Sequence, residues 1–102
     1  MSYKILTLTQ GCFNNNYLGI KDAKDLFPED AIGGSNKSLK GNLITLNLGM
    51  QDKIITDVDD EHNIFRNRSW FNEFARIHNL KVGDKVVIHK VGDRSFHIYP
   101  KV

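Results

Sequence analysis

The segment from residue 64 to residue 89 constrains the fold of this chain most strongly. Its first part, residues 64–68, predicts a strand with two arginines on one face, since side chains two positions apart share a face. Next comes an apolar stripe at the i, i+3, i+4, i+7 spacing of an amphipathic helix, made of Trp70, Phe71, Phe74, Ala75 and Ile77. Gly83 and Asp84 then lead into a second strand over residues 85–91. The aromatic stripe is therefore expected to be core.

The start of that helix has a capping signal. Ser69 directly precedes the stripe, and a serine hydroxyl can accept a hydrogen bond from a free backbone N–H of the first turn. Glu73 lies in the first turn, where a negative charge interacts favourably with the helix dipole. We predict that the helix begins at Ser69.

Strands dominate the rest of the chain. Alternating or β-rich runs predict five further strands, at residues 4–9, 17–20, 43–48, 53–58 and 95–99. A short helix is expected over residues 21–27, because Pro28 disfavours helical geometry in the residue before it. Loops are expected at 10–16, 29–42 and 57–63, which are rich in Asn, Gly and charged residues. The fold class is therefore mostly β (α+β), with seven strands and two short helices.

Composition limits the number of domains and the setting. With 102 residues, 40% of them hydrophobic, the chain is expected to form one domain over residues 1–102. A net charge of +2 permits a nucleic-acid partner without requiring one. Cys12 is alone and cannot form an internal disulfide, so a reducing, cytoplasmic location is expected. The polar amino end and the lack of a long apolar run predict no signal sequence and no membrane partner.

No enzymatic template fits the sequence. It contains neither a Gly-x-Ser-x-Gly nucleophile elbow nor a Gly-x-x-x-x-Gly-Lys-Ser/Thr phosphate loop. Four histidines, at positions 62, 78, 89 and 97, form no His-Glu-x-x-His motif. We expect a protein that is not an enzyme and has no catalytic residues, metal or cofactor.

The acidic run over residues 57–61 has two interpretations. Hard oxygen ligands cluster in this way around divalent cations, which would suit a magnesium-dependent nuclease. The run lacks the glycine of a calcium loop and any following carboxylate-x-lysine arrangement. Solvated charges or hydrogen-bond acceptors are the favoured interpretation.

Arg66 and Arg68 follow the acidic run. On one strand face their guanidinium groups could bind phosphate or the edge of guanine. The alternative is ion pairing with Asp57, Asp59 or Glu61 across the bend, and the sequence leaves both open. If the acids also contact DNA, they can accept from cytosine N4 while arginine reads guanine.

Amide and lysine side chains in two loops have similar double interpretations. Gln10 and residues 14–16, all asparagine, either stabilise turns or present amides to adenine edges and phosphates. Lys37 and Lys40, in the Gly-rich loop, are either solvated or in contact with phosphates.

The order of these elements resembles the DNA-binding pseudobarrel called the B3 domain. The best-matching segments are residues 23–28 (AKDLFP), 65–74 (FRNRSWFNEF) and 79–88 (NLKVGDKVVI). That family includes plant hormone-response transcription factors and restriction endonucleases of the EcoRII and BfiI kinds. Thr56-Asp57 and the Arg66-x-Arg68 pair resemble the restriction-enzyme branch more closely, whereas the plant branch carries more basic residues in its first arm.

The resemblance implies a seven-stranded pseudobarrel that grips the major groove of double-stranded DNA with two arms. The arms would be residues 10–16 and 57–63. It implies the target-recognition module of a restriction endonuclease or a standalone relative, with a nuclease domain or subunit as a further partner and a monomeric isolated domain. The expected DNA-binding residues are Gln10, Asn14, Asn15, Asn16, Lys37, Lys40, Asp57, Asp59, Asp60, Glu61, His62, Asn63, Arg66 and Arg68.

Three alternatives remain beside this hypothesis. Residues 80–88 (LKVGDKVVI) also resemble the swapped-hairpin antitoxins and transition-state regulators, which build one barrel from two chains. The second is the metal-dependent nuclease, and the third is a protein- or carbohydrate-binding β-module that binds no DNA.

Overall fold

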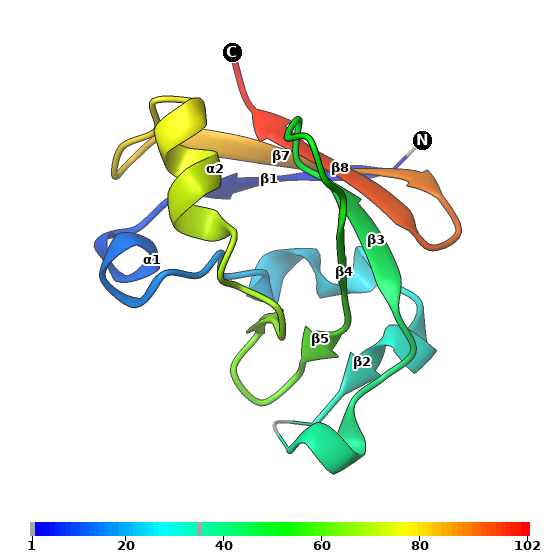
Figure 1. Ribbon diagram of the computed structural model, residues 1–102. Coiled ribbons are helices and arrows are strands. Elements are labelled where there is room, and N and C mark those ends of the chain that lie inside the picture. Colours follow the sequence, from blue (N-terminus) through cyan, green and yellow to red (C-terminus); the bar gives the residue numbers. More distant parts are fainter. Residues whose placement is uncertain (1, 35) are drawn as a thin grey trace.

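Two β-sheets and a set of short helices surround one core (Figure 1). The computed structural model describes residues 2–34 and 36–102, apart from the side chain of residue 37. The larger sheet has the order β1 (Tyr3–Thr7), β7 (Lys85–Gly92), β8 (Ser95–Pro100), β3 (Ile44–Asn47) and β4 (Ile54–Thr56). The smaller sheet has the order β2 (Ile32–Gly33), β5 (Val58–Asp59) and β6 (Ile64–Phe65).

Most neighbouring strands are antiparallel, and two pairings are parallel. In the large sheet β3 runs parallel to β8, with Leu46 opposite Phe96. In the small sheet β2 runs parallel to β5, with Ile32 opposite Val58. The β7–β8 hairpin pairs with β1 on one side and β3 on the other, so it lies within the sheet of its own chain.

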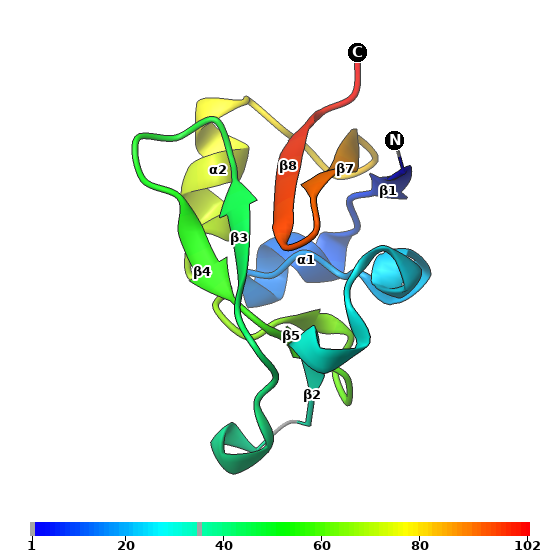
Figure 2. The ribbon, with the colours of Figure 1, turned by 90° about the vertical axis from the view of Figure 1, so that its right-hand side faces the viewer.

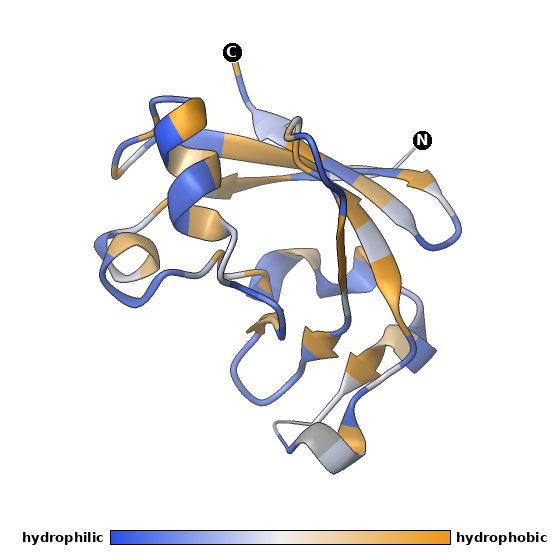
Figure 3. Cartoon of the chain, in the orientation of Figure 1, coloured by the Kyte–Doolittle hydropathy of each residue, from blue (hydrophilic) through white to orange (hydrophobic). Residues whose placement is uncertain are grey.

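The helices are short. The two α-helices are α1 (Gln10–Asn15) and α2 (Phe71–Ile77), and the three 3-10 helices are η1 (Lys21–Leu26), η2 (Glu29–Ala31) and η3 (Lys37–Leu39). Figures 1 and 2 both show α1 below α2, and the segment that contains η3 protruding from the lower end of the molecule. Figure 3 shows the apolar residues concentrated on the strands and α2, with polar residues along the connecting loops.

Aromatic rings join the two sheets and α2 into one core. Phe27 packs edge-on to Phe65 of the small sheet and lies 4.7 Å, centroid to centroid, from Phe96 of the large sheet. Trp70 packs edge-on to Phe74 within α2, and its indole N–H donates to the Asn67 carbonyl. Such pairs contribute beyond their burial of apolar area.

The mostly-β fold class and the amphipathic helix are confirmed. The described residues form eight strands rather than seven, arranged in two sheets. The strand expected at residues 17–20 is reduced to a single bridge between Gly19 and Ile64. The expected helix at 21–27 is the 3-10 helix η1, which ends at Phe27 in extended geometry before the proline.

Three local predictions were wrong. Residues 10–16 form α1 instead of a loop, because Thr9 caps it through a hydrogen bond from the Cys12 N–H and the Cys12 side chain is buried. The N-cap of α2 is Trp70 rather than Ser69, and no side chain of its own caps it. The predicted strand 64–68 ends at Phe65, so Arg66 and Arg68 do not share a strand face.

The segment after β2 forms a loop whose two ends cross at backbone contact. The Gly34 N–H donates to the Leu39 carbonyl, and the Asn42 N–H donates to the Asp30 carbonyl. A Cβ on Gly33 would lie 2.4 Å from the Leu39 oxygen and 2.5 Å from the Gly41 nitrogen. Only glycine fits such a crossing, which explains why the loop begins and ends with this residue.

An alanine at position 41 should destabilise the protein. Its Cβ would lie 2.6 Å from the carbonyl carbon of Ala31, and a backbone atom cannot move aside as a side chain can. Overpacking of this kind costs roughly 1–3 kcal/mol, measurable by urea denaturation. Gly19→Ala is the matched control, because its nearest neighbour would be a Tyr17 ring carbon at 3.8 Å. Equal losses in both variants would contradict the tight crossing.

Candidate nucleic-acid interface

The first arm, residues 10–16, is held by hydrogen bonds within α1. The Gln10 side-chain amide donates to Asn14 Oδ1 at 2.9 Å, and the Asn15 amide donates to the Gly11 carbonyl at 3.2 Å. Gln10, Asn14 and Asn15 are exposed to solvent. Their amides thus stabilise the helix and still present polar groups on its surface.

Asn16 joins the first arm to α2. It adopts the left-handed conformation (φ 56°) that ends α1, and its Oδ1 accepts a hydrogen bond from the Asn72 backbone N–H at 2.9 Å. Asn72 lies in the first turn of α2, where backbone N–H groups have no partner within the helix. A residue 56 positions away in sequence therefore caps α2 in place of Ser69.

The second arm, residues 57–63, combines β5 with a tight turn. Asp59 is nearly buried, and its Oδ1 accepts from the backbone N–H groups of Glu61 and His62 at 3.1 and 3.3 Å. Its Oδ2 lies 2.9 Å from His62 Nδ1. Burial acts to raise the pKa of Asp59, but the hydrogen bonds from His62 outweigh it and lower that pKa below its ordinary value.

The buried Asp57 and the partly buried Arg66 form an ion pair where this arm begins. Arg66 Nε donates to Asp57 Oδ1 at 2.7 Å and Nη2 donates to Oδ2 at 3.0 Å; the side chains are 19% and 2% exposed. The Gly41 N–H also donates to Asp57 Oδ2, and Arg66 Nη2 donates to the Gly34 carbonyl. The hydrogen bond with Asp57 raises the pKa of Arg66 against the effect of burial. The ion-pair interpretation of Arg66 thus has direct geometric support.

The remaining residues of this arm lie nearer to solvent. Asp60 is exposed and forms an ion pair with Lys24 of η1, with 2.6 Å between Lys24 Nζ and Asp60 Oδ1. Glu61 is exposed at the turn, and Asn63 takes the left-handed conformation with φ 56°. Arg68 is exposed beyond the end of β6.

A hollow of about 450 Å³ separates the two arms, and we call it the inter-arm hollow. The first arm and the residue that follows it contribute Cys12 and Tyr17, and the second contributes His62 and Asn63. The floor and walls come from β1 and η1, and from two residues between the named elements. They are Ile5, Leu6 and Thr7 of β1, Lys21 and Asp22 of η1, and Thr9 and Gly19. Of the sequence-predicted site residues, the hollow is therefore lined only by His62 and Asn63, whereas Gln10, Asn14, Asn15 and Asn16 of the first arm do not line it.

The Gly-rich loop carries the predicted lysines. Lys40 is exposed and borders a shallow groove with Leu43, Ile55 and the Asp57–Arg66 pair. Lys37 lies in η3, and its side chain is outside the described part of the structure. The loop has hydrogen bonds of its own, because the Ser38 N–H and hydroxyl both donate to Asn36 Oδ1.

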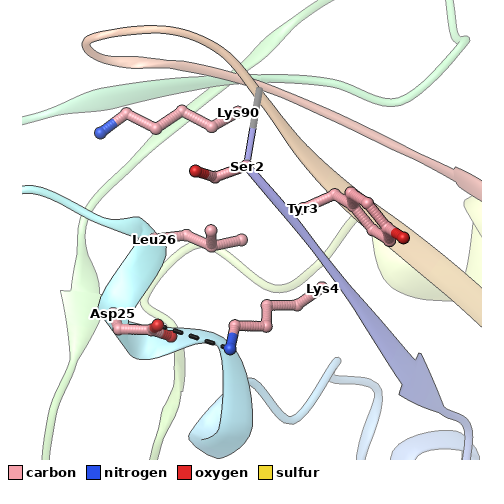
Figure 4. Close-up of a pocket in the computed structure, with 6 residues that line it drawn as sticks. All are labelled: Ser2, Tyr3, Lys4, Asp25, Leu26 and Lys90. Atoms are coloured by element: carbon pink, nitrogen blue, oxygen red, sulfur yellow. Dashed lines mark ion pairs between the residues drawn. The ribbon is translucent and has the colours of Figure 1, made fainter.

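A second hollow of about 400 Å³ opens between β1, η1 and β7 (Figure 4). Its polar lining includes Ser2, Lys4, Asp25 and Lys90, and Lys4 Nζ lies 3.4 Å from Asp25 Oδ2. None of the sequence-predicted site residues lines it. Because Asp25 neutralises one of its two lysines, we take the inter-arm hollow as the candidate site.

Sequence reasoning missed several residues of the inter-arm hollow. Thr7 and Thr9 were assigned only to a strand face, and Tyr17, Lys21 and Asp22 to minor elements. The alternation of β1 does place Thr7 opposite to the buried Leu6 and Leu8, and this signal could have identified it as a surface residue.

The described residues lack two kinds of feature. They contain no group of three or more His, Cys, Asp or Glu side chains placed to hold a metal ion. They also contain no helix that is both long and apolar enough to cross a lipid bilayer.

Comparison with known proteins gives one structural likeness. No protein-family model matches the chain, and no curated protein matches it in sequence. The solved N-terminal domain of Helicobacter pylori LlaJI.R1 matches with a TM-score of 0.61 at 6% sequence identity. The match covers 100% of this chain and 88% of that one. At this identity the likeness establishes a shared fold.

Removing the buried charge of Asp57 should strongly destabilise the protein. Asp57→Asn leaves the Arg66 guanidinium without its counter-charge and turns an amide N–H₂ toward groups that donate. Breaking a buried pair from one side costs roughly 3–5 kcal/mol, measurable by chemical denaturation. Glu73→Gln, which removes an exposed contact with Arg76 at 4.0 Å, is the control and should cost less than about 1 kcal/mol. A similar midpoint for both variants would disprove the structural role of the Asp57–Arg66 pair.

The cap provided by Asn16 can be isolated with glycine. Asn16→Gly keeps the left-handed backbone but removes the acceptor for the Asn72 N–H, and should cost about 1 kcal/mol. Hydrogen exchange at Asn72 should accelerate. Asn79→Gly is the control, because Asn79 has a similar φ of 54° and its side chain caps no helix among the described residues. Unchanged exchange at Asn72 in Asn16→Gly would contradict the cap.

Proposed function

We propose that this protein binds specific sites in double-stranded DNA by placing its two arms in the major groove. The observation that supports the proposal is the inter-arm hollow, a concave surface lined by His62 and Asn63 of the second arm and by Cys12 of the first arm. In this proposal the protein recognises DNA and does not cut it.

The charge of the surface suits selective contacts better than bulk attraction. Non-specific DNA binding arises from many lysine and arginine contacts to phosphates. Here the net charge is only +2, and Asp22, Lys21, His62 and Asn63 stand together around the hollow. Mixed donors and acceptors of this kind can distinguish base edges, which carry different patterns of donors and acceptors in the major groove.

The sequence-predicted residues, together with Lys21 of the inter-arm hollow, would have different tasks. Asn14, His62 and Asn63 would contact base edges, together with exposed amides of the first arm. Lys21, Lys37, Lys40 and Arg68 would contact phosphates, which sets the register on the duplex. Asp57 and Arg66 would not contact DNA, since their polar atoms already form hydrogen bonds with one another. They would instead hold the second arm in position.

The restriction-system setting draws on the sequence resemblance and the structural likeness. The matching domain belongs to LlaJI.R1, a restriction-related protein, and the shared fold extends over the whole of this chain. We propose that this chain is a target-recognition module of a restriction system, acting as a monomer beside a nuclease domain or subunit.

Specific features of the structure weigh against two of the rival functions. The swapped-hairpin hypothesis requires strands from a second chain, whereas β7 here pairs on both sides with strands of the same chain. The nuclease hypothesis requires free carboxylates, whereas Asp57 and Asp59 accept hydrogen bonds from neighbouring residues. A nuclease would cleave DNA when incubated with magnesium, and a β-module for protein or carbohydrate would bind no duplex.

Selection from a random pool of duplexes tests the proposal. A recurring sequence should emerge, and fluorescence anisotropy should then show tighter binding to it than to scrambled DNA. Asn63→Gly, which tolerates the left-handed backbone, should reduce discrimination at one position by about 1–3 kcal/mol. Lys40→Ala should weaken all duplexes alike and reduce the salt slope by about 1.

Lys101→Ala serves as the matched control for loss of a positive charge. Lys101 precedes the last residue of the sequence, and the carboxyl end lies on the opposite side of the molecule from β2 and the η3 segment that follows it (Figure 1). It should bind DNA as the unmodified protein does. Failure to enrich any duplex, or uniform loss across all positions in Asn63→Gly, would refute base reading by the second arm.

A further inference from the structure

We propose that His62 reads an exocyclic amino group of a DNA base, adenine N6 or cytosine N4, through its Nε2 atom, which Asp59 keeps as a hydrogen-bond acceptor. The inference rests on the proposed DNA binding and specifies the chemistry that one residue recognises. It follows from the way in which Asp59 is held.

Three hydrogen bonds fix the Asp59 carboxylate. The backbone N–H groups of Glu61 and His62 both donate to Oδ1, and His62 Nδ1 lies 2.9 Å from Oδ2. The Asp59 side chain is 11% exposed, whereas that of His62 is 61% exposed. A nearly buried carboxylate thus orients an imidazole that remains open to a partner.

The carboxylate also selects the tautomer of His62. An ionised carboxylate can only accept hydrogen bonds, so the proton of a neutral imidazole must reside on Nδ1. Nε2 then carries a lone pair and no hydrogen. No described residue forms a hydrogen bond with Nε2, which leaves this lone pair for a ligand.

The position of His62 determines which ligand it meets. Its side chain lines the inter-arm hollow together with Asn63, and Lys21 and Asp22 of η1 line the facing wall. Glu61 and the Lys24–Asp60 ion pair lie on the same turn or against it. In the major groove the only base groups that donate hydrogen bonds are adenine N6 and cytosine N4, so an acceptor in this place selects those bases.

Protonation reverses this preference. A protonated imidazole has N–H groups on both nitrogens, so Nε2 becomes a donor suited to guanine O6 and N7 or thymine O4. Histidine charge commonly changes between about pH 5 and 8. Asp59 remains ionised across this range, since its pKa is lowered, and continues to hold Nδ1.

Asp59→Asn should reverse the preference without any change of pH. The two backbone N–H groups at Oδ1 require the amide oxygen to stay in that position, which places the amide N–H₂ at the site of Oδ2. There it donates to His62 Nδ1, so the imidazole proton moves to Nε2. The neutral imidazole of the variant therefore presents a donor to DNA, whereas the neutral imidazole of the unmodified protein presents an acceptor.

The experiment measures base preference at each position of the selected site. Fluorescence anisotropy with single-base-substituted duplexes is recorded at about pH 8 and about pH 5. At one position the unmodified protein should favour adenine or cytosine at the higher pH, by roughly 5-fold or more, and lose that preference at the lower pH. Asp59→Asn should favour guanine or thymine there at the higher pH. Nitrogen NMR of the His62 ring reports the tautomer in each protein.

Two further variants control the result. His62→Ala changes a largely exposed side chain and should abolish both the preference and its pH dependence. His89→Ala, in β7 on the large sheet, should leave both intact. If the protein binds its site with the same base preference at both pH values, or if His62→Ala retains the shift, the inference is wrong while DNA binding stands. If no duplex binds, the proposed function is itself wrong and the inference falls with it.

Discussion

The structure depends most on the contact between the Asp57 carboxylate and the Arg66 guanidinium. Two charges removed from water require nearly complete hydrogen bonding, and these two obtain it from Gly34 and Gly41 of the Gly-rich loop. One ion pair therefore joins the loop after β2, the start of β5 and the end of β6. The small sheet has only two-residue strands, so this junction supplies much of what keeps it in place.

The two arms are also held by a few hydrogen bonds. Each is ordered by a side chain that satisfies backbone N–H groups: Asn16 at the end of α1 and Asp59 within the second turn. Core packing positions α2 and the large sheet, whereas the arm surfaces contribute little to it. Exposed residues such as Asn14 and His62 can consequently change without disturbing the core, while the residues beneath them maintain the arm geometry.

Local patterns in the sequence predicted the mostly-β class, α2 and the β7–β8 hairpin, because each is encoded by neighbouring residues. The helix α1 could not be read in this way. Three consecutive asparagines are typical of a turn, and the helix is decided by the burial of Cys12 and by the distant contact to Asn72. The assignment of the two arms to DNA remains a prediction, and residues of both segments, Cys12 from the first and His62 and Asn63 from the second, line one hollow. The balance between a DNA contact and an ion pair for Arg66 was left open, since the burial of Asp57 arises only when the Gly-rich loop folds over it.

The crossing of Gly33 and Gly41 has a consequence for how such a protein can diversify. The backbone atoms of the two glycines are in contact, so the loop leaves and rejoins the rest of the domain at fixed positions. These positions do not depend on the residues in between. Closing a somewhat longer segment over the same junction adds little entropic cost. The protruding piece is thus an exchangeable module, open to lengthening or replacement, and new reach along a binding partner can evolve without rebuilding the domain that carries it.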